Sequence, residues 1–333
     1  MFRSVNGYIN YLTTNIMGTV YFLGIDMAKK TFEGALTVDG KTFYQVDSDN
    51  TEMAIQVFFK ELIKKFGIPS AQLMVCMEHT GIYCRPLLEF LIKNHIKVCL
   101  ESSIQIKRSQ GMVRGKNDKI DAQRIALYAY KNREDLTFWT PQRQVIQKLK
   151  ALLVTRDRLI GCKTELQVPI HECEEFIEES IHNMIVKGCK NSIKILERDI
   201  EKIEKMIENL VKEDTQLKVK YQLVTSVTGI GKITALNMIV STGEFTRIRE
   251  AKKFACYSGV APFEYSSGTS IRGKTRVSKI ANMTIKKLLH LAAMSAIQYD
   301  DEIKLYYRRK VAEGKNKMSV INAVRNKLIS RVF

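Results

Sequence analysis

The stretch YFLGIDMAKKTFEGALTVDG, residues 21–40, decides the fold of the N-terminal half of this chain. Its first residues, 21–25, are apolar and predict a buried strand, and Asp26 follows at the end of that strand. A polar break leads to a second apolar-rich run, residues 31–38, which predicts another strand. Asp26 is therefore either a solvated residue at a strand end or the first ligand of a metal site that cuts nucleic acid.

The net charge of the chain is strongly positive. Its 333 residues include 53 Lys plus Arg and 35 Asp plus Glu, which gives a formal net charge of +18. Such an excess favours a polyanionic partner, because each neutralised phosphate releases a counterion. The sequence contains no apolar run long enough to cross a membrane, no recognisable secretory leader and no CxxC pair among its seven cysteines. These features predict a cytoplasmic protein that binds nucleic acid and has no membrane partner.

Residues 19–142 alternate between strand-like and helix-like segments and predict a mixed α/β domain. The strand-like segments are 20–25, 31–38, 42–47, 73–77 and 97–100, and the helix-like segments are 51–66, 83–94 and 118–131. A three-strand meander followed by alternating helices and strands is the element order of an RNase H-like fold, although other mixed folds share it. Residues 1–18 precede this pattern and are interpreted as an N-terminal extension.

Residues 143–220 predict a helical coiled-coil hairpin. Apolar residues recur at steps of three and four, at positions 193, 196, 200, 203, 207 and 210. Gly188 marks the expected turn between the two helices.

Residues 221–333 predict a mainly α-helical C-terminal domain. Within it, VTGIGKI (residues 227–233) predicts a helix–hairpin–helix, whose backbone N–H groups can hold a phosphate. A tight turn between two packed helices is an equally simple interpretation of the same glycines.

Acidic residues stand at positions of this framework where chemistry can take place. Asp26 and Glu78 each end an apolar strand, and Asp118 and Asp121 lie three residues apart on one helical face. Converging carboxylates repel one another unless cations lie between them, and hard divalent ions such as Mg²⁺ prefer oxygen ligands. Any one of these acids is more simply a strand-end or helix-start residue. All four in a basic protein predict a site for phosphodiester chemistry.

A second concentration of polar residues lies within residues 257–296. Ser266, Ser267 and Gly268 predict a small-residue turn, and residues 271–290 carry Lys and Arg but no acid. A serine activated by its electrostatic surroundings can attack a phosphodiester. On composition alone, a loop that only binds phosphate is the simpler interpretation. The predicted nucleic-acid contacts in the chain are Arg114, Lys116, Lys119, Lys232, Arg272, Lys274, Arg276 and Lys279.

These motifs resemble those of a known family. The stretches FLGIDMAKKTFEGAL, MEHTGIYCRPLLEFL and KNDKIDAQRIALYA are similar to the three DEDD blocks of the transposases of the insertion sequence 110 family, which includes the 1111 group and the Piv-type DNA invertases. Residues 227–293 resemble the C-terminal transposase domain of the same family. The similar blocks span about residues 19–300, in the family's order.

The resemblance implies a fold and a mechanism. It implies a RuvC-like N-terminal domain whose four acids bind Mg²⁺, for which Mn²⁺ can substitute. It also implies a nucleophile at Ser267, with Ser266 as the alternative, that attacks DNA and forms a phosphoserine link. Members excise and insert their element, some of them guided by a bridge RNA that pairs with donor and target DNA. They assemble as homo-oligomers, dimers or tetramers, in which the coiled coil joins the subunits.

The sequence departs from the family pattern in places, and other functions stay open. Pro169 interrupts a predicted helix, and Ala281 and Ile285 stand where the family more usually has Gly and Leu. The alternatives are a site-specific DNA invertase or RuvC-like nuclease of the same fold, and an inactive copy that only binds nucleic acid.

Overall fold

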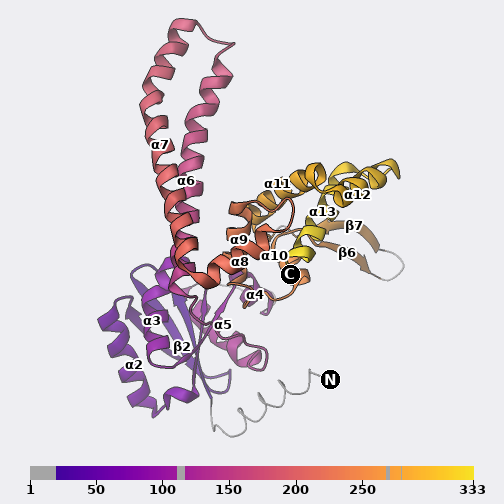
Figure 1. Ribbon diagram of the computed structural model, residues 1–333. Helices are drawn as coiled ribbons and strands as arrows, with labels where there is room; N and C mark the ends of the chain where they lie inside the picture. The colour runs from indigo at the N-terminus through magenta and orange to yellow at the C-terminus, as the bar shows by residue number, and fades with distance from the viewer. Residues whose placement is uncertain (1–19, 111–116, 268–270, 279) are drawn as a thin grey trace. The chain divides into compact units, whose positions relative to one another are not determined.

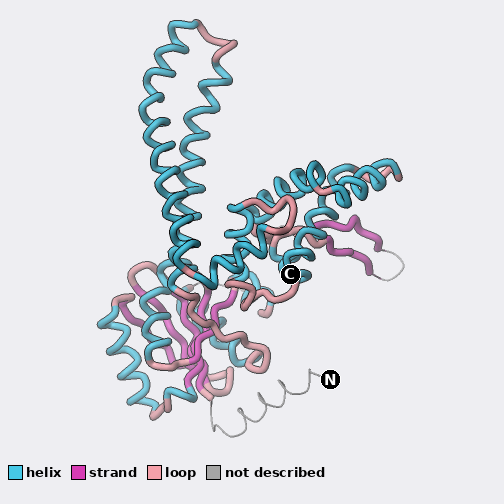
Figure 2. The backbone as a smooth tube through the Cα atoms, in the orientation of Figure 1, coloured by secondary structure: helices cyan, strands magenta, loops and turns pink. Residues whose placement is uncertain are grey.

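The computed structural model describes residues 20–110, 117–267, 271–278 and 280–333 of the chain. The predicted N-terminal extension, residues 1–18, lies outside this described part. The chain divides into two compact units, of which the first ends at Pro141 and the second is Gln142–Phe333. Figures 1 and 2 show strands mainly in the first unit and long helices in the second.

The N-terminal unit is built on a mixed sheet in the strand order β3-β2-β1-β4-β5. Strand β1 pairs antiparallel with β2 and parallel with β4. The strands are β1 (Tyr21–Met27), β2 (Thr31–Thr37), β3 (Tyr44–Asp49), β4 (Leu73–Glu78) and β5 (Lys97–Glu101), and the helices are α2 (Glu52–Phe66), α3 (Arg85–Lys93), α4 (Ser103–Arg108) and α5 (Asp118–Lys131). The predicted RNase H-like element order is thereby confirmed.

The two faces of this sheet differ because side chains alternate along each strand. Leu23 and Ile25 of β1 belong to a hydrophobic cluster that includes the buried residues of α2 and α3. Phe22 belongs to a separate cluster on the opposite face, together with buried residues of α5. Asp26 shares the parity of Phe22 and therefore lies on the face that α5 covers.

Helix α5 lies unusually close to β1 at one glycine. A Cβ atom on Gly24 would lie 2.4 Å from the carbonyl oxygen of Ala122 and 2.2 Å from the backbone nitrogen of Ala126. Only glycine fits such a contact. Because Gly24 lies two residues before Asp26 on the same face, this packing places the first turn of α5 beside Asp26.

The second unit begins with a long helical hairpin of α6 (Gln144–Cys173) and α7 (Glu179–Glu213), seen in Figure 1. The predicted seam is confirmed, because Ile200 and Ile207 are buried and Ile203 and Leu210 are partly buried.

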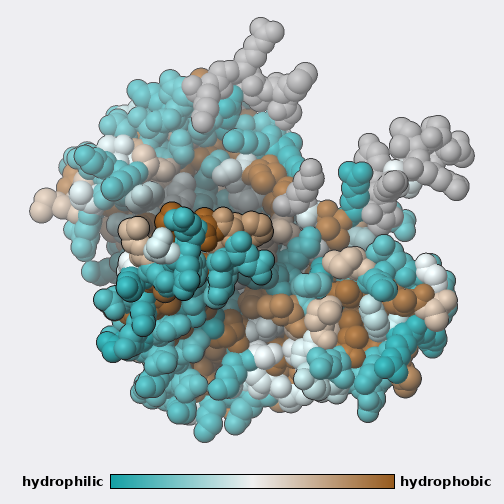
Figure 3. All heavy atoms as spheres, turned by 90° about the horizontal axis from the view of Figure 1, so that it is seen from above, coloured by the Kyte–Doolittle hydropathy of each residue, from teal (hydrophilic) through white to brown (hydrophobic). Residues whose placement is uncertain are grey.

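The surface seen from above is mainly hydrophilic, with hydrophobic residues among the polar ones (Figure 3).

The predicted turn near Gly188 is wrong. The chain reverses between α6 and α7, and Gly188 lies inside α7 with no atom within 4 Å of where its Cβ would be. An interior glycine costs a helix only about 1 kcal/mol, which the packing of a long hairpin outweighs. Pro169 likewise lies within α6, so it does not interrupt that helix as predicted, although α6 ends about one turn later.

The rest of the second unit packs around a helical core that also contains residues of α6 and α7. Its elements are α8 (Thr215–Thr225), α9 (Lys232–Thr242), α10 (Ala251–Tyr257), β6 (Pro262–Ser267), β7 (Ile271–Val277), α11 (Met283–Tyr299), α12 (Asp301–Ala312) and α13 (Lys317–Val332). The predicted mainly α-helical domain is confirmed. The β6–β7 hairpin was not predicted, and it places Ser266 and Ser267 in a strand rather than in a turn.

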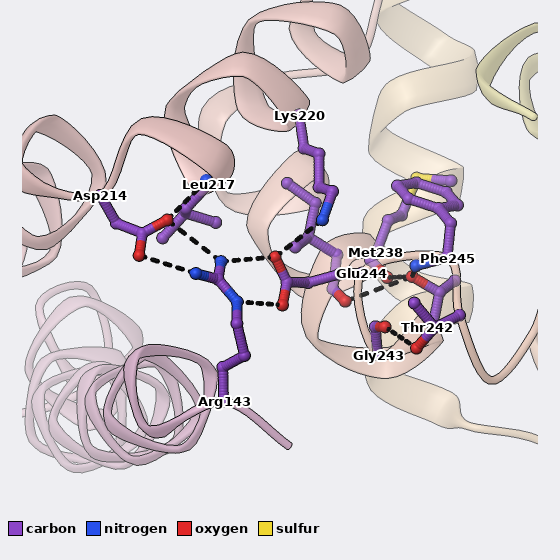
Figure 4. A network of polar contacts seen from close by, with 11 residues as sticks. Arg143, Asp214, Leu217, Lys220, Met238, Thr242, Gly243, Glu244 and Phe245 are labelled. Carbon is purple, nitrogen blue, oxygen red and sulfur yellow. Dashed lines mark hydrogen bonds and ion pairs between the residues drawn. The ribbon is translucent and has the colours of Figure 1, made fainter.

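An ion-pair network joins the base of α6 to the start of α8 and the end of α9 (Figure 4). The Arg143 guanidinium donates to both oxygens of Asp214 at 2.8 and 3.0 Å, and to both oxygens of Glu244 at 2.7 and 2.8 Å. Lys220 Nζ also donates to Glu244, at 2.9 Å. Hydrogen bonds from Arg143 lower the pKa values of both the Asp214 and the Glu244 carboxyls.

Candidate active site

The four acids predicted from the sequence line a common cavity of 340 Å³ in the N-terminal unit. Strands β1 and β4 are parallel neighbours with Ile25 opposite Met77, so Asp26 and Glu78 follow at the same level of the sheet. Asp118 and Asp121 come from the first turn of α5. Strand pairing and helix packing thus bring together residues that are far apart in sequence.

The first turn of α5 is fixed by its cap. The Asn117 side chain accepts a hydrogen bond from the backbone N–H of Lys119 at 2.9 Å, and this satisfies one of the unpaired donors at the start of the helix. Since Asn117 takes this role, the Asp118 carboxylate does not serve as the N-cap and is placed in the cavity lining.

Neighbouring side chains orient two of the acids. Ser103 Oγ, at the start of α4, donates to Glu78 Oε2 at 2.6 Å. Arg124 donates to Asp121 Oδ1 at 2.7 Å, one turn further along α5, and both side chains are at least three-quarters buried. Neither Ser103 nor Arg124 was predicted. Their contacts depend on how α4 and α5 fold back on the sheet, which no sequence pattern indicated.

Glu33 is a further carboxylate in the lining of the cavity and was also missed. It lies directly opposite Asp26 in the antiparallel β1–β2 pair. Its Oε2 atom is buried and has no hydrogen-bond partner. Burial raises the pKa of the Glu33 carboxyl, with nearby Lys119 lowering it and Asp47 raising it further. The signal was present in the sequence, because a tight hairpin over residues 27–32 pairs position 33 with position 26.

The donor chemistry of the cavity fits a hard divalent cation. Its lining combines the carboxylates of Asp26, Glu33, Glu78, Asp118 and Asp121 with the cations of Lys107 and Arg124. Carboxylate oxygens are the ligands that Mg²⁺ and similar ions take, and the buried, unpaired Glu33 oxygen is available to such an ion. Within the part of the chain that the structure describes, no three Asp, Glu, His or Cys side chains stand close enough together to hold a metal ion.

The predicted serine lies in the other compact unit. Ser266 and Ser267 end β6, where Ser266 pairs with Arg272 and Ser267 with Ile271 across the hairpin. The Ser267 side chain and Gly268 lie outside what the structure describes. The assignment of the nucleophile to Ser267 therefore stays a prediction.

The predicted nucleic-acid contacts are spread over both units. Lys119 is exposed on α5, and Arg276 is exposed on β7. Lys232 opens α9 with its side chain 73% exposed, after Gly231, which gives no side-chain cap to the helix. Arg272 and Lys274 belong to β7, but their side chains are outside the described part of the chain, as are Arg114, Lys116 and Lys279 altogether.

The segment predicted as a helix–hairpin–helix forms a turn between two helices, which agrees with either interpretation of its glycines. Helix α8 ends at Thr225, and α9 begins at Lys232, with the glycine-containing turn between them. Gly229 has a φ of +93°, and a Cβ on it would lie 2.7 Å from the carbonyl oxygen of Ala292. Close packing onto α11 therefore explains Gly229 by itself, and the turn leaves the first N–H groups of α9 without a side-chain cap.

Fold and cavity together define an RNase H-like domain with a carboxylate site, joined to a second, mainly helical unit. Residues 23–173 match the family model of the DEDD transposases of the IS110 type, described as "Transposase". Residues 221–308 match the model described as "Transposase IS116/IS110/IS902 family". The chain thus carries two transposase domains of the IS110 family, one in each half, and these indicate DNA transposase or recombinase activity. Carboxylate sites of this fold generally use divalent metal ions.

Relatives of this chain include both an invertase and a transposase. The chain is 26% identical to the pilin gene-inverting protein of Moraxella bovis over 321 residues, which is 93% of each chain. It is 25% identical to the transposase for insertion sequence element IS1111A of Coxiella burnetii over 210 residues, covering 55% of this chain and 56% of that one. Both similarities agree with the family assignment.

A comparison of structures finds RuvC of Thermus thermophilus, described in complex with a Holliday junction substrate. The match covers 36% of this chain and 99% of that one, at 12% sequence identity and a TM-score of 0.28. The score is low, so the RNase H-like assignment rests on the strand order and the family match.

Among the described residues, no helix is long and apolar enough to span a bilayer.

Proposed function

We propose that this recombinase cuts and rejoins DNA through a serine nucleophile assisted by Mg²⁺, with Asp26, Glu78, Asp118 and Asp121 as the ligands of the ion. The gathering of these acids in one cavity carries the proposal. When bound, the divalent ion supplies positive charge to the phosphodiester oxygens as negative charge builds up on them. Mn²⁺ fits the same oxygen ligands.

The serine step is a phosphoryl transfer. The Ser267 hydroxyl loses its proton, Oγ forms a bond to phosphorus, and one bond between phosphorus and a deoxyribose oxygen breaks. The released deoxyribose hydroxyl takes up a proton, and the protein is left joined to the DNA through a phosphoserine. A strand hydroxyl then attacks this phosphoserine, which restores the serine and joins the DNA. No net hydrolysis occurs, and this distinguishes the proposal from a nuclease that uses water.

Trapping of the covalent intermediate tests this assignment. The full chain is incubated with Mg²⁺, with DNA that flanks its gene and with RNA transcribed from that DNA, and is then denatured and examined for a protein–DNA adduct. We expect the adduct with the native chain and with Ser266→Ala, and its loss with Ser267→Ala. An adduct that persists in Ser267→Ala but disappears in Ser266→Ala would move the nucleophile by one residue. Mg²⁺-dependent cleavage without any adduct would instead indicate a RuvC-like nuclease.

A guide RNA and a homo-oligomer complete the proposal. The net charge of +18 suits both DNA and RNA as partners, and family membership supports a bridge RNA that pairs with donor and target DNA. The assembly is a dimer or tetramer in which the α6–α7 hairpin joins subunits. If RNA guides the reaction, ribonuclease treatment abolishes cutting at a defined site, while non-specific, salt-sensitive DNA binding persists.

Site-specific DNA inversion is the second candidate function. It is favoured by the similarity to the pilin gene-inverting protein, which extends over 93% of both chains. A DNA substrate that carries two recombination sites in inverted orientation discriminates the two functions. An invertase flips the intervening segment, whereas a transposase excises the element and joins its ends.

A further inference from the structure

We propose that Glu33 supplies a fifth carboxylate to the divalent-metal site, acting with Asp26 from the neighbouring strand. The inference rests on the proposed function, because it assigns an additional ligand to the same cavity. It concerns a residue outside the four acids of the DEDD pattern.

The register of the sheet places Glu33 within a row of acids. Asp26 of β1 lies opposite Glu33 of β2, and Glu33 lies opposite Asp47 of β3. On the other side of Asp26, the parallel pairing with β4 brings Glu78 to the same level. Directly opposed residues share one face of a sheet, and like charges in such positions are destabilising.

Only some of the acids in this row line the cavity. Asp26, Glu33 and Glu78 line it, whereas Asp47 does not and is solvent-exposed. The parity of β2 agrees with this placement, since Ala35, two residues after Glu33, packs against Ala122 and therefore on the α5 side of the sheet. Glu33 thus faces the same space as the predicted metal ligands.

Hydrogen bonding does not explain Glu33 as a structural residue. Its Oε2 atom is buried without a hydrogen-bond partner, and a buried, unpaired carboxylate oxygen costs folding free energy. Glu is also a poor strand former, so a β-branched residue would suit this position better for folding alone. A divalent cation bound between Glu33 and Asp26 would remove both the repulsion and the unpaired oxygen.

Ser103 and Arg124 occupy oxygen atoms of two of the predicted metal ligands, so an additional carboxylate would help to hold the ion. Glu78 Oε2 accepts from Ser103, and Asp121 Oδ1 accepts from Arg124, so each of these carboxylates has one oxygen already engaged. The uncommitted Oε2 of Glu33 adds a donor on the Asp26 side of the cavity. We therefore assign Glu33 to direct or water-mediated contact with the ion that Asp26 holds.

Binding of Mn²⁺ to the purified full chain tests the proposal without relying on activity. Free Mn²⁺ is measured by electron paramagnetic resonance during titration of the native chain, Glu33→Gln, Asp26→Asn and Asp47→Asn. We expect Glu33→Gln to weaken Mn²⁺ binding at least about tenfold, as loss of a supporting ligand does. Asp47→Asn is the matched control, because it removes an acid from the same row but outside the cavity. We expect less than a twofold change there.

A second variant at position 33 distinguishes the loss of a metal ligand from misfolding. Glu33→Asp keeps the charge but withdraws the carboxylate by one methylene, so its Mn²⁺ affinity should lie between those of the native chain and Glu33→Gln. Fluorescence of Trp139, which packs against the core of the N-terminal unit, shows whether each variant is folded. In EDTA, Glu33→Gln should unfold at the same or a higher urea concentration than the native chain.

The outcomes separate this inference from the proposed function. Unchanged Mn²⁺ affinity in Glu33→Gln, together with weakened binding in Asp26→Asn, overturns the role of Glu33 and leaves the four-acid site standing. Unchanged affinity in both variants overturns the metal site itself. Equal weakening in Glu33→Gln and Asp47→Asn reduces Glu33 to a contribution of general negative charge and also overturns the proposal.

Discussion

Two clusters of carboxylates in this chain have opposite electrostatic environments. In the second unit, Asp214 and Glu244 share the Arg143 guanidinium, Lys220 adds a second cation to Glu244, and the pKa values of both carboxyls are lowered. Among the described residues that line the N-terminal cavity, acids outnumber cations, and burial raises the pKa of the Glu33 carboxyl.

The difference indicates what each cluster is for. A carboxylate whose oxygens are paired with guanidinium and ammonium groups already has its hydrogen-bond partners within the protein. Removing such a carboxylate lowers the free energy of unfolding. Carboxylates grouped with too few cations make folding less favourable, so their presence indicates an outside partner. By this criterion the Arg143 network has the features of a structural cluster, and the N-terminal cavity agrees with the metal site that we propose.

Asp26→Asn gives the largest expected effect and tests the functional side of the comparison. Recombination should fall by about 10³-fold, because a metal ion supplies several kcal/mol of charge stabilisation to phosphoryl transfer. The urea midpoint followed by Trp139 fluorescence shows whether the variant is folded. A destabilised protein that retained recombination would place Asp26 among the structural carboxylates instead.

Arg143→Ala should have its main effect on stability. Removing the guanidinium leaves Asp214 without its main partner and buried Glu244 with Lys220 alone, so we expect a loss of about 3 kcal/mol in the second unit. Far-UV circular dichroism of the helices should show the shift, while the Trp139 transition stays in place. The matched control is Arg309→Ala, whose ion pair with Glu313 is largely exposed and should contribute less than about 1 kcal/mol.

At low pH, the native chain and Arg143→Ala should have nearly the same free energy of unfolding. The ordinary pKa values are 3.8 for Asp214 and 4.5 for Glu244, and both are lowered in the folded chain. Lowered carboxyl pKa values contribute stability that is present above the ordinary values and is lost as pH falls through the folded ones. The stability gap should therefore be full at pH 7 and shrink below about pH 4. A gap of constant size down to pH 2 would mean that packing, not charge, makes Arg143 important.

The sequence predicted the N-terminal unit well because its signals are local. Apolar runs bounded by polar residues predicted the strands, and Asp26 and Glu78 were placed where two of these runs end. The coiled-coil seam at Ile200 and Ile207 could be predicted equally well, since heptad spacing depends only on helical geometry. The turn of the hairpin was missed because a lone glycine is a weak helix breaker compared with the packing of two long helices.

The sequence by itself determined which residues are the candidates for the chemistry, through residue type, spacing and family resemblance: the four acids, the serine pair and the basic runs. Tertiary structure alone decided how the acids are surrounded. The close contact at Gly24 sets α5 against β1, and the fold of α4 brings Ser103 to Glu78. These contacts join residues distant in sequence and depend on backbone packing, which no local pattern of side chains encodes.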